Sequence, residues 1–126
     1  MTTTRKRYDK FSTEFGLWLR EQREIDSSLG YLTTNLDYIW VNYKTHDWML
    51  LEEKRHGAIV RLWQQQIFNH LDKFLQSDNH YKGFHKIVFQ NTNPEDGYIW
   101  LDGISITKAE LLEFLQFKTI GNLRDP

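Results

Sequence analysis

Three stretches of the chain place apolar residues at helical spacing. The first runs from about residue 8 to 25, the second from 58 to 76, and the third from 108 to about 117. Thr107 followed three residues later by Glu110 predicts a capping box at the start of the third helix. The apolar stripe of the second helix is formed by Val60, Trp63, Ile67, Leu71 and Phe74.

Between these helices the pattern changes to short runs rich in aromatic and β-branched residues, which are typical of strands. The predicted strands are 31–34, 37–43, 48–54, 84–90, 98–101 and 104–106, separated by polar turns. The order is therefore helix, three strands, helix, strands, helix. We expect a single α/β domain over residues 1–126, with one mixed sheet flanked by helices and a C-terminal hairpin and helix.

The hairpin formed by the second and third predicted strands carries the most informative polar residues. A four-residue loop at 44–47 would place Asp37 opposite Lys54 and put Glu52 diagonal to Asp37. Because side chains alternate along a strand, all three would then lie on one face of the sheet. A register shifted by two residues keeps them together, whereas a shift by one residue separates them.

Asp37, Glu52 and Lys54 are the residue types needed for metal-dependent phosphodiester hydrolysis. Two neighbouring carboxylates repel each other unless a cation neutralises them, and oxygen ligands suit Mg²⁺ or Mn²⁺. A lysine beside the phosphate could orient the attacking water or stabilise developing charge. The backbone carbonyl of Glu53 is a further candidate ligand. The alternative interpretation is an exposed strand end on which Glu52 and Lys54 are ordinary surface charges.

The second helix contains three consecutive glutamines that point in different directions. With Ile67 at the centre of the stripe, Gln64 lies within the apolar face, Gln65 almost opposite it, and Gln66 at its edge. A buried amide needs a hydrogen-bond partner, so Gln64 is predicted either to support the site or to bond to the backbone.

Composition and charge narrow the function classes. The formal net charge of −1 argues against binding nucleic acid by bulk attraction, and the absence of cysteine excludes disulfides and zinc–thiolate sites. No apolar run is long enough to span a membrane, so a soluble, cytoplasmic protein is expected. Local contacts to nucleic acid could come from Lys6, Arg7, Arg55 and Arg61, for which a solvated surface is the alternative.

The Asp37 and Glu52-Glu53-Lys54 elements, with this order of helices and strands up to residue 90, resemble the PD-(D/E)xK nuclease superfamily. Leu36 stands where the motif name places proline. The resemblance implies a restriction-endonuclease-like core, with Gln64 in the role of a helix glutamine. Some branches carry an acidic residue on the first helix, for which Glu14 and Glu21 are equal candidates.

The resemblance also implies Mg²⁺-dependent cleavage of DNA by a compact endonuclease of phage or bacterial type, acting as a homodimer in the bacterial or phage-infected cytoplasm. We therefore predict a metal-dependent nuclease. The rival hypothesis is a catalytically inactive nuclease-fold protein that acts as a regulatory module binding nucleic acid or protein.

Overall fold

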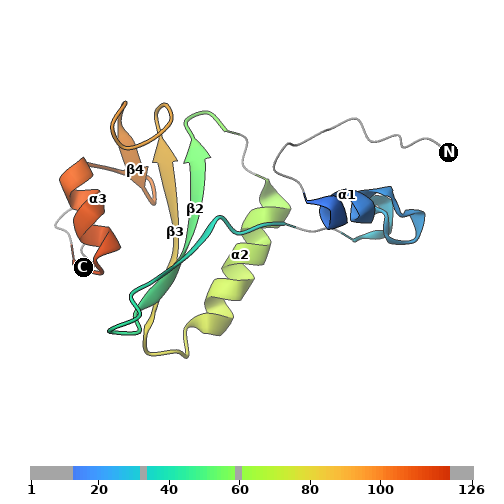
Figure 1. Ribbon diagram of the computed structural model, residues 1–126, viewed down its shortest axis with the longest axis horizontal. Coiled ribbons are helices and arrows are strands. Elements are labelled where there is room, and N and C mark those ends of the chain that lie inside the picture. The colour runs from blue at the N-terminus through green and yellow to red at the C-terminus, as the bar shows by residue number, and fades with distance from the viewer. Residues whose placement is uncertain (1–12, 32–33, 59–60, 120–126) are drawn as a thin grey trace. The chain divides into compact units, whose positions relative to one another are not determined.

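The computed structural model of the protein describes residues 13–31, 34–58 and 61–119 (Figure 1). The chain divides into two compact units, residues 1–34 and 35–126. In the first unit, helix α1 spans Glu14–Glu21 and is capped by the preceding Thr13, whose hydroxyl accepts a hydrogen bond from the Gly16 N–H.

The predictions for the first unit are met in part. Helix α1 ends at Glu21, because a short 3₁₀ turn at Arg23–Ile25 replaces the last helical turn expected up to residue 25. A second 3₁₀ turn follows at Ser27–Leu29. The start of the predicted helix before residue 13 lies outside the described residues. Of the strand predicted at 31–34, residues 32 and 33 also lie outside them, and Tyr31 and Thr34 belong to no strand.

The second unit is built on one five-stranded mixed sheet, which confirms the α/β class. The strands are β1 (Tyr38–Val41), β2 (Trp48–Arg55), β3 (Tyr81–Phe89), β4 (Ile99–Leu101) and β5 (Ile104–Ile106), and they lie side by side in chain order. Strands β2 and β3 are parallel, and the other neighbouring pairs are antiparallel. Helix α2 (Leu62–Leu75) connects β2 to β3, as a parallel pair requires.

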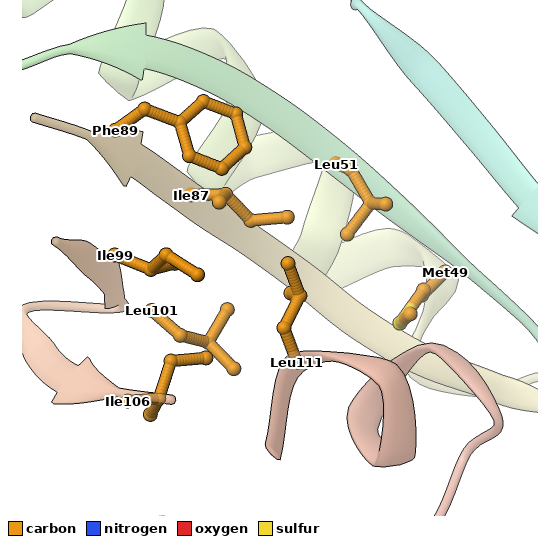
Figure 2. Close-up of a cluster of buried hydrophobic side chains, with 8 residues drawn as sticks. All are labelled: Met49, Leu51, Ile87, Phe89, Ile99, Leu101, Ile106 and Leu111. Atoms are coloured by element: carbon orange, nitrogen blue, oxygen red, sulfur yellow. The ribbon is translucent and has the colours of Figure 1, made fainter. Parts of the chain in front are cut away.

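One face of the sheet packs against helix α3 (Lys108–Leu115) through an apolar core (Figure 2). Side chains from four strands and from α3 meet there: Met49, Leu51, Ile87, Phe89, Ile99, Leu101, Ile106 and Leu111. The predicted capping box is confirmed, since the Thr107 side chain accepts from the Glu110 N–H and the Glu110 carboxylate accepts from the Thr107 N–H. Helix α3 is thus fixed at its start and anchored by Leu111.

The opposite face of β2 and β3 is covered by α2. Phe68 of α2 is 4% exposed, and its ring lies 5.0 Å from the ring of Phe84 in β3. Leu50, paired with Phe84 in the β2–β3 ladder, is buried beside them. Strand β2 is therefore covered on both faces, which explains why four consecutive residues from Met49 to Glu52 are buried.

The β1–β2 hairpin corrects the predicted register by two residues. The expected loop at 44–47 would have placed Tyr43 opposite Trp48, but the partner of Trp48 is Val41. The loop spans six residues because Asn42 begins the turn: its side-chain oxygen accepts from the backbone N–H groups of residues 44 and 45, and its own N–H donates to the Asp47 carbonyl. The loop length remains even, so each strand keeps its faces.

The apolar stripe predicted for α2 does not face the sheet. Ile67 is 38% exposed and Phe74 is 68% exposed, while Phe68 is the buried residue of the helix. Asp72 lies on the sheet side because its carboxylate accepts hydrogen bonds from the Tyr81 hydroxyl at 2.5 Å and the Phe84 N–H at 3.1 Å. Polar anchors to β3 therefore decide which side of α2 faces the sheet. Val60 of the predicted stripe lies outside the described residues.

Strand β3 begins three residues earlier than the predicted strand at 84–90. Its first part contains a bulge, because the pairing moves from Trp48–Tyr81 to Leu50–Phe84 and inserts one extra residue in β3. Gly83 has φ +104° at this point, a conformation that glycine adopts without steric cost.

In the described part of the chain, no helix is long and apolar enough to cross a membrane.

Candidate functional site

Glu52 is a carboxylate placed inside the fold. Its position in β2, covered by α2, leaves 4% of it exposed, and it is the one buried polar or charged residue among the described residues. A buried charge is costly unless partners or a cation compensate for it. One carboxylate oxygen lies 3.4 Å from the backbone nitrogen of Asp37, and the other lies 3.4 Å from Lys54 Nζ.

Asp37 lies directly before β1, and the observed register brings it to Glu52. The last ladder pair is Tyr38 with Leu51, so counting one residue further sets Asp37 opposite Glu52 rather than opposite Lys54. The Asp37 carboxylate accepts a hydrogen bond of 2.8 Å from the Glu53 N–H. The Asp37 backbone in turn donates to Glu52. These two bonds fix the start of β1 against the polar half of β2.

Lys54 completes the cluster from the next position on the same face of β2. Its ammonium group forms an ion pair with Glu52 and donates a 3.3 Å hydrogen bond to the side-chain oxygen of Gln64 on α2. Gln64 precedes Phe68 by four residues, so it lies one turn along the sheet-facing side of the helix. Asp37, Glu52, Lys54 and Gln64, here called the DEKQ cluster, therefore come together from a strand end, β2 and α2.

Glu53 points to the other face of the sheet. The Tyr38 hydroxyl donates to its carboxylate at 3.0 Å, and the same hydrogen bond raises the pKa of Tyr38. The side chain of Glu53 is thus separated from the DEKQ cluster, although its N–H bonds to Asp37. Its carbonyl as a metal ligand remains a prediction.

The surroundings of Glu52 disfavour its ionised form. Burial raises its pKa, and the negative charge of Asp37 raises it further. Lys54 acts in the opposite direction through its charge and its contact, as does the hydrogen bond from the Asp37 backbone, but the net shift is upward. The ionised form of Glu52 is therefore incompletely compensated by the protein alone.

A small divalent cation fits this chemistry. Two neighbouring carboxylates, those of Asp37 and the buried Glu52, provide hard oxygen ligands, which Mg²⁺ and Mn²⁺ prefer. The part of the chain described by the structure contains no group of three or more His, Cys, Asp or Glu side chains that could hold a metal ion. A cation here would rely on Asp37 and Glu52 and would complete its shell with backbone, water or phosphate oxygens, as Mg²⁺ commonly does.

The other predicted residues are exposed or lie outside the described residues. Arg55, the last residue of β2, and Arg61, directly before α2, are both exposed. Lys6 and Arg7 lie outside the described residues. The acidic candidates of α1, Glu14 and Glu21, are exposed residues of the separate first unit.

Two positions near the cluster were missed from the sequence. Lys86 of β3 pairs with Glu52 in the parallel ladder, and Val88 pairs with Lys54. The parallel register between β2 and β3 determines both neighbours, and it depends on the bulge at Gly83. The alternation of side chains along β3 indicates that Lys86 and Val88 share a face, but it does not predict which residues of β2 they pair with.

Comparisons of the chain with protein-family models, with curated proteins and with solved structures found no match.

Proposed function

We propose that the protein is a metal-dependent nuclease that hydrolyses phosphodiester bonds, with DNA as the expected substrate. The observation that supports this most strongly is the buried Glu52 carboxylate, joined to Asp37 on one side and to the Lys54–Gln64 pair on the other. Burial and the charge of Asp37 raise the pKa of Glu52, and perturbed carboxylates of this kind are common at functional sites.

Each residue of the cluster has a distinct role in this proposal. Asp37 and Glu52 would hold Mg²⁺ or Mn²⁺, and the bound ion would activate a water molecule and neutralise charge on the phosphate. Lys54 presents its ammonium group to the phosphate and stabilises the negative charge that develops as the bond breaks. Gln64 accepts a 3.3 Å hydrogen bond from Lys54. This bond keeps the Lys54 ammonium group from being held by Glu52 alone.

The overall reaction is hydrolysis. The water oxygen forms a bond to phosphorus, one ester P–O bond breaks, and the leaving oxygen takes up a proton to become a hydroxyl. The products are a phosphate monoester and an alcohol at the two new ends of the strand. The protein needs no redox partner or second cofactor for this balance.

Cleavage assays test the proposal. Purified protein is incubated with supercoiled plasmid, linear duplex and branched DNA in Mg²⁺, in Mn²⁺ and in EDTA. We expect cutting of at least one substrate with either metal, none in EDTA, and none by Glu52→Gln. Glu113→Gln, an exposed carboxylate of α3, is the control and should cut like the wild type. Absence of cutting on every substrate, or cutting by Glu52→Gln at the wild-type rate, contradicts the proposal.

A further inference from the structure

Three aromatic side chains contact one another at the end of β2 and at β4 in the second unit. The rings of His56 and Trp100 are stacked at 5.2 Å with an angle of 24° between their planes, and Tyr98 lies 6.2 Å from Trp100. Trp100 belongs to β4, Tyr98 directly precedes it, and His56 follows the end of β2. We refer to His56, Tyr98 and Trp100 as the aromatic surface.

The aromatic surface is open to solvent, although its backbone is well fixed. Tyr98 is 66% exposed and His56 is also exposed, while Trp100 is half-buried beneath them. The Tyr98 N–H donates to the Gln90 side chain at 3.0 Å, and the His56 N–H donates to the Phe89 carbonyl at 2.8 Å. Large rings held in place but exposed lose little conformational freedom when a flat ligand stacks on them.

The sheet register connects this surface to the DEKQ cluster. Val88 of β3 pairs with Lys54 on one side and with Trp100 on the other, so the three residues form one row across β2, β3 and β4. Two strand spacings separate the backbones of Lys54 and Trp100, or about 10 Å. Lys86, the ladder partner of Glu52, lies two residues before Val88 and therefore on the same face.

The composition of this row favours a nucleotide strand as its ligand. Lysines at two positions can meet phosphates, and the rings beside them can stack on bases, which is how proteins hold single-stranded nucleic acid. The row also lies toward the carboxyl end of the parallel strands β2 and β3, where open α/β sheets usually bind ligands.

We infer that the aromatic surface stacks an unpaired nucleobase next to the phosphate bound at the DEKQ cluster, so that the preferred substrate has unpaired bases beside the cleaved bond. This inference rests on the proposed nuclease function and specifies its substrate class. Stacking on Tyr98 and His56 requires a base free of its partner strand, because a paired base in a continuous duplex is already stacked on both faces.

Binding without turnover tests the inference separately from cleavage. Fluorescence anisotropy in EDTA measures the affinity for a labelled 15-nucleotide thymidine strand, for an abasic strand of the same length, and for a blunt duplex. We expect the wild type to prefer the thymidine strand over the abasic strand. Tyr98→Ala should weaken binding of the thymidine strand by about tenfold, the scale of one lost base–ring stack, and leave the abasic strand unchanged.

Two further variants complete the design. Tyr98→Phe retains the ring and should retain the preference for bases. Tyr43→Ala removes a tyrosine that is even more exposed, at 79%, from the loop at the other end of β2 and should bind like the wild type. Equal wild-type affinity for thymidine and abasic strands, or a preference that survives in Tyr98→Ala, overturns the inference. A base preference that depends on Tyr98 supports it even if no DNA is cut, and that result would reject the proposed nuclease activity alone.

Discussion

Replacing Glu52 by glutamine tests the metal site through stability rather than through turnover. The change keeps the shape of the side chain but removes one of two carboxylates and its ion pair with Lys54. Because the pKa of Glu52 is raised above its ordinary value of 4.5, the folded state holds the proton more tightly than the unfolded state. The stability that this proton provides is lost as the pH rises from 4.5 through the raised folded-state pKa.

The neutral glutamine imitates the protonated acid, so without metal Glu52→Gln should be more stable than the wild type at pH 8, with a smaller difference at pH 4. Divalent metal should reverse this order. Binding to the folded state alone, at a free Mg²⁺ concentration ten times the dissociation constant, adds about 1.4 kcal/mol to the wild-type free energy of unfolding. For a chain of this length that corresponds to a rise in Tm of roughly 3–6 °C.

Thermal unfolding followed by circular dichroism, with Mg²⁺ or Mn²⁺ titrated against EDTA, measures this rise. The wild type and Glu113→Gln should show it, and Glu52→Gln should lose most of it. Asp72→Asn removes a different half-buried carboxylate from the same side of the sheet, so it should lower the baseline Tm and keep the metal-induced rise. A wild-type Tm that does not change with metal, or an equal rise in the Tm of Glu52→Gln, would contradict a metal site at Glu52.

Three further predictions follow from individual contacts. Gln64→Ala frees Lys54 from its amide partner and should lower the cleavage rate by about tenfold, whereas Gln66→Ala on the outer side of α2 should leave it unchanged in the same assay. Burial lowers the pKa of His85, but hydrogen bonds from its two ring nitrogens to Asp102 and to a backbone carbonyl outweigh burial, and the net shift of the pKa is upward. The imidazolium therefore stabilises the fold below about pH 6.5, and this stability is lost as the pH rises through the folded-state pKa. Urea unfolding should therefore show the largest deficit of His85→Gln near pH 5.5, and a deficit that is independent of pH contradicts this. Asp72→Asn should cost about 1–3 kcal/mol in the same experiment, the scale of a weakened buried hydrogen-bond acceptor, and a cost near zero would show that its two bonds do not fix α2.

The elements of the second unit could be predicted well because their signals are local. The apolar run followed by charges gave β2 almost to its ends, and the Thr107–Glu110 spacing gave the capping box of α3. The β1–β2 register was wrong by two residues because the side chain of Asn42 forms its own turn. The grouping of Asp37 with Glu52 survived, since a shift of two residues preserves the faces of both strands.

Helix α2 shows where periodicity is insufficient. A pattern-based helix face assumes that polar residues point outward, yet Gln64 and Asp72 face the sheet because Lys54, Tyr81 and the Phe84 N–H offer them partners there. Gln64 bonds to Lys54, one of the predicted site residues, although the apolar stripe used to place it is exposed. The neighbours of the cluster in β3 depend on a bulge at Gly83, and no local pattern in the chain specifies a parallel register.

The most direct test of the central claim is the single-turnover rate of DNA cleavage in Mg²⁺ by the wild type and by Lys54→Ala. Lys54 is the one cation joined to both Glu52 and Gln64 in the described part of the chain, and it binds no metal itself. Its removal should lower the rate by about 10²–10³-fold, the usual cost of losing one group that stabilises developing charge, while the metal-induced rise in Tm persists. A Lys54→Ala rate equal to that of the wild type would show that the DEKQ cluster is not the site of phosphodiester hydrolysis.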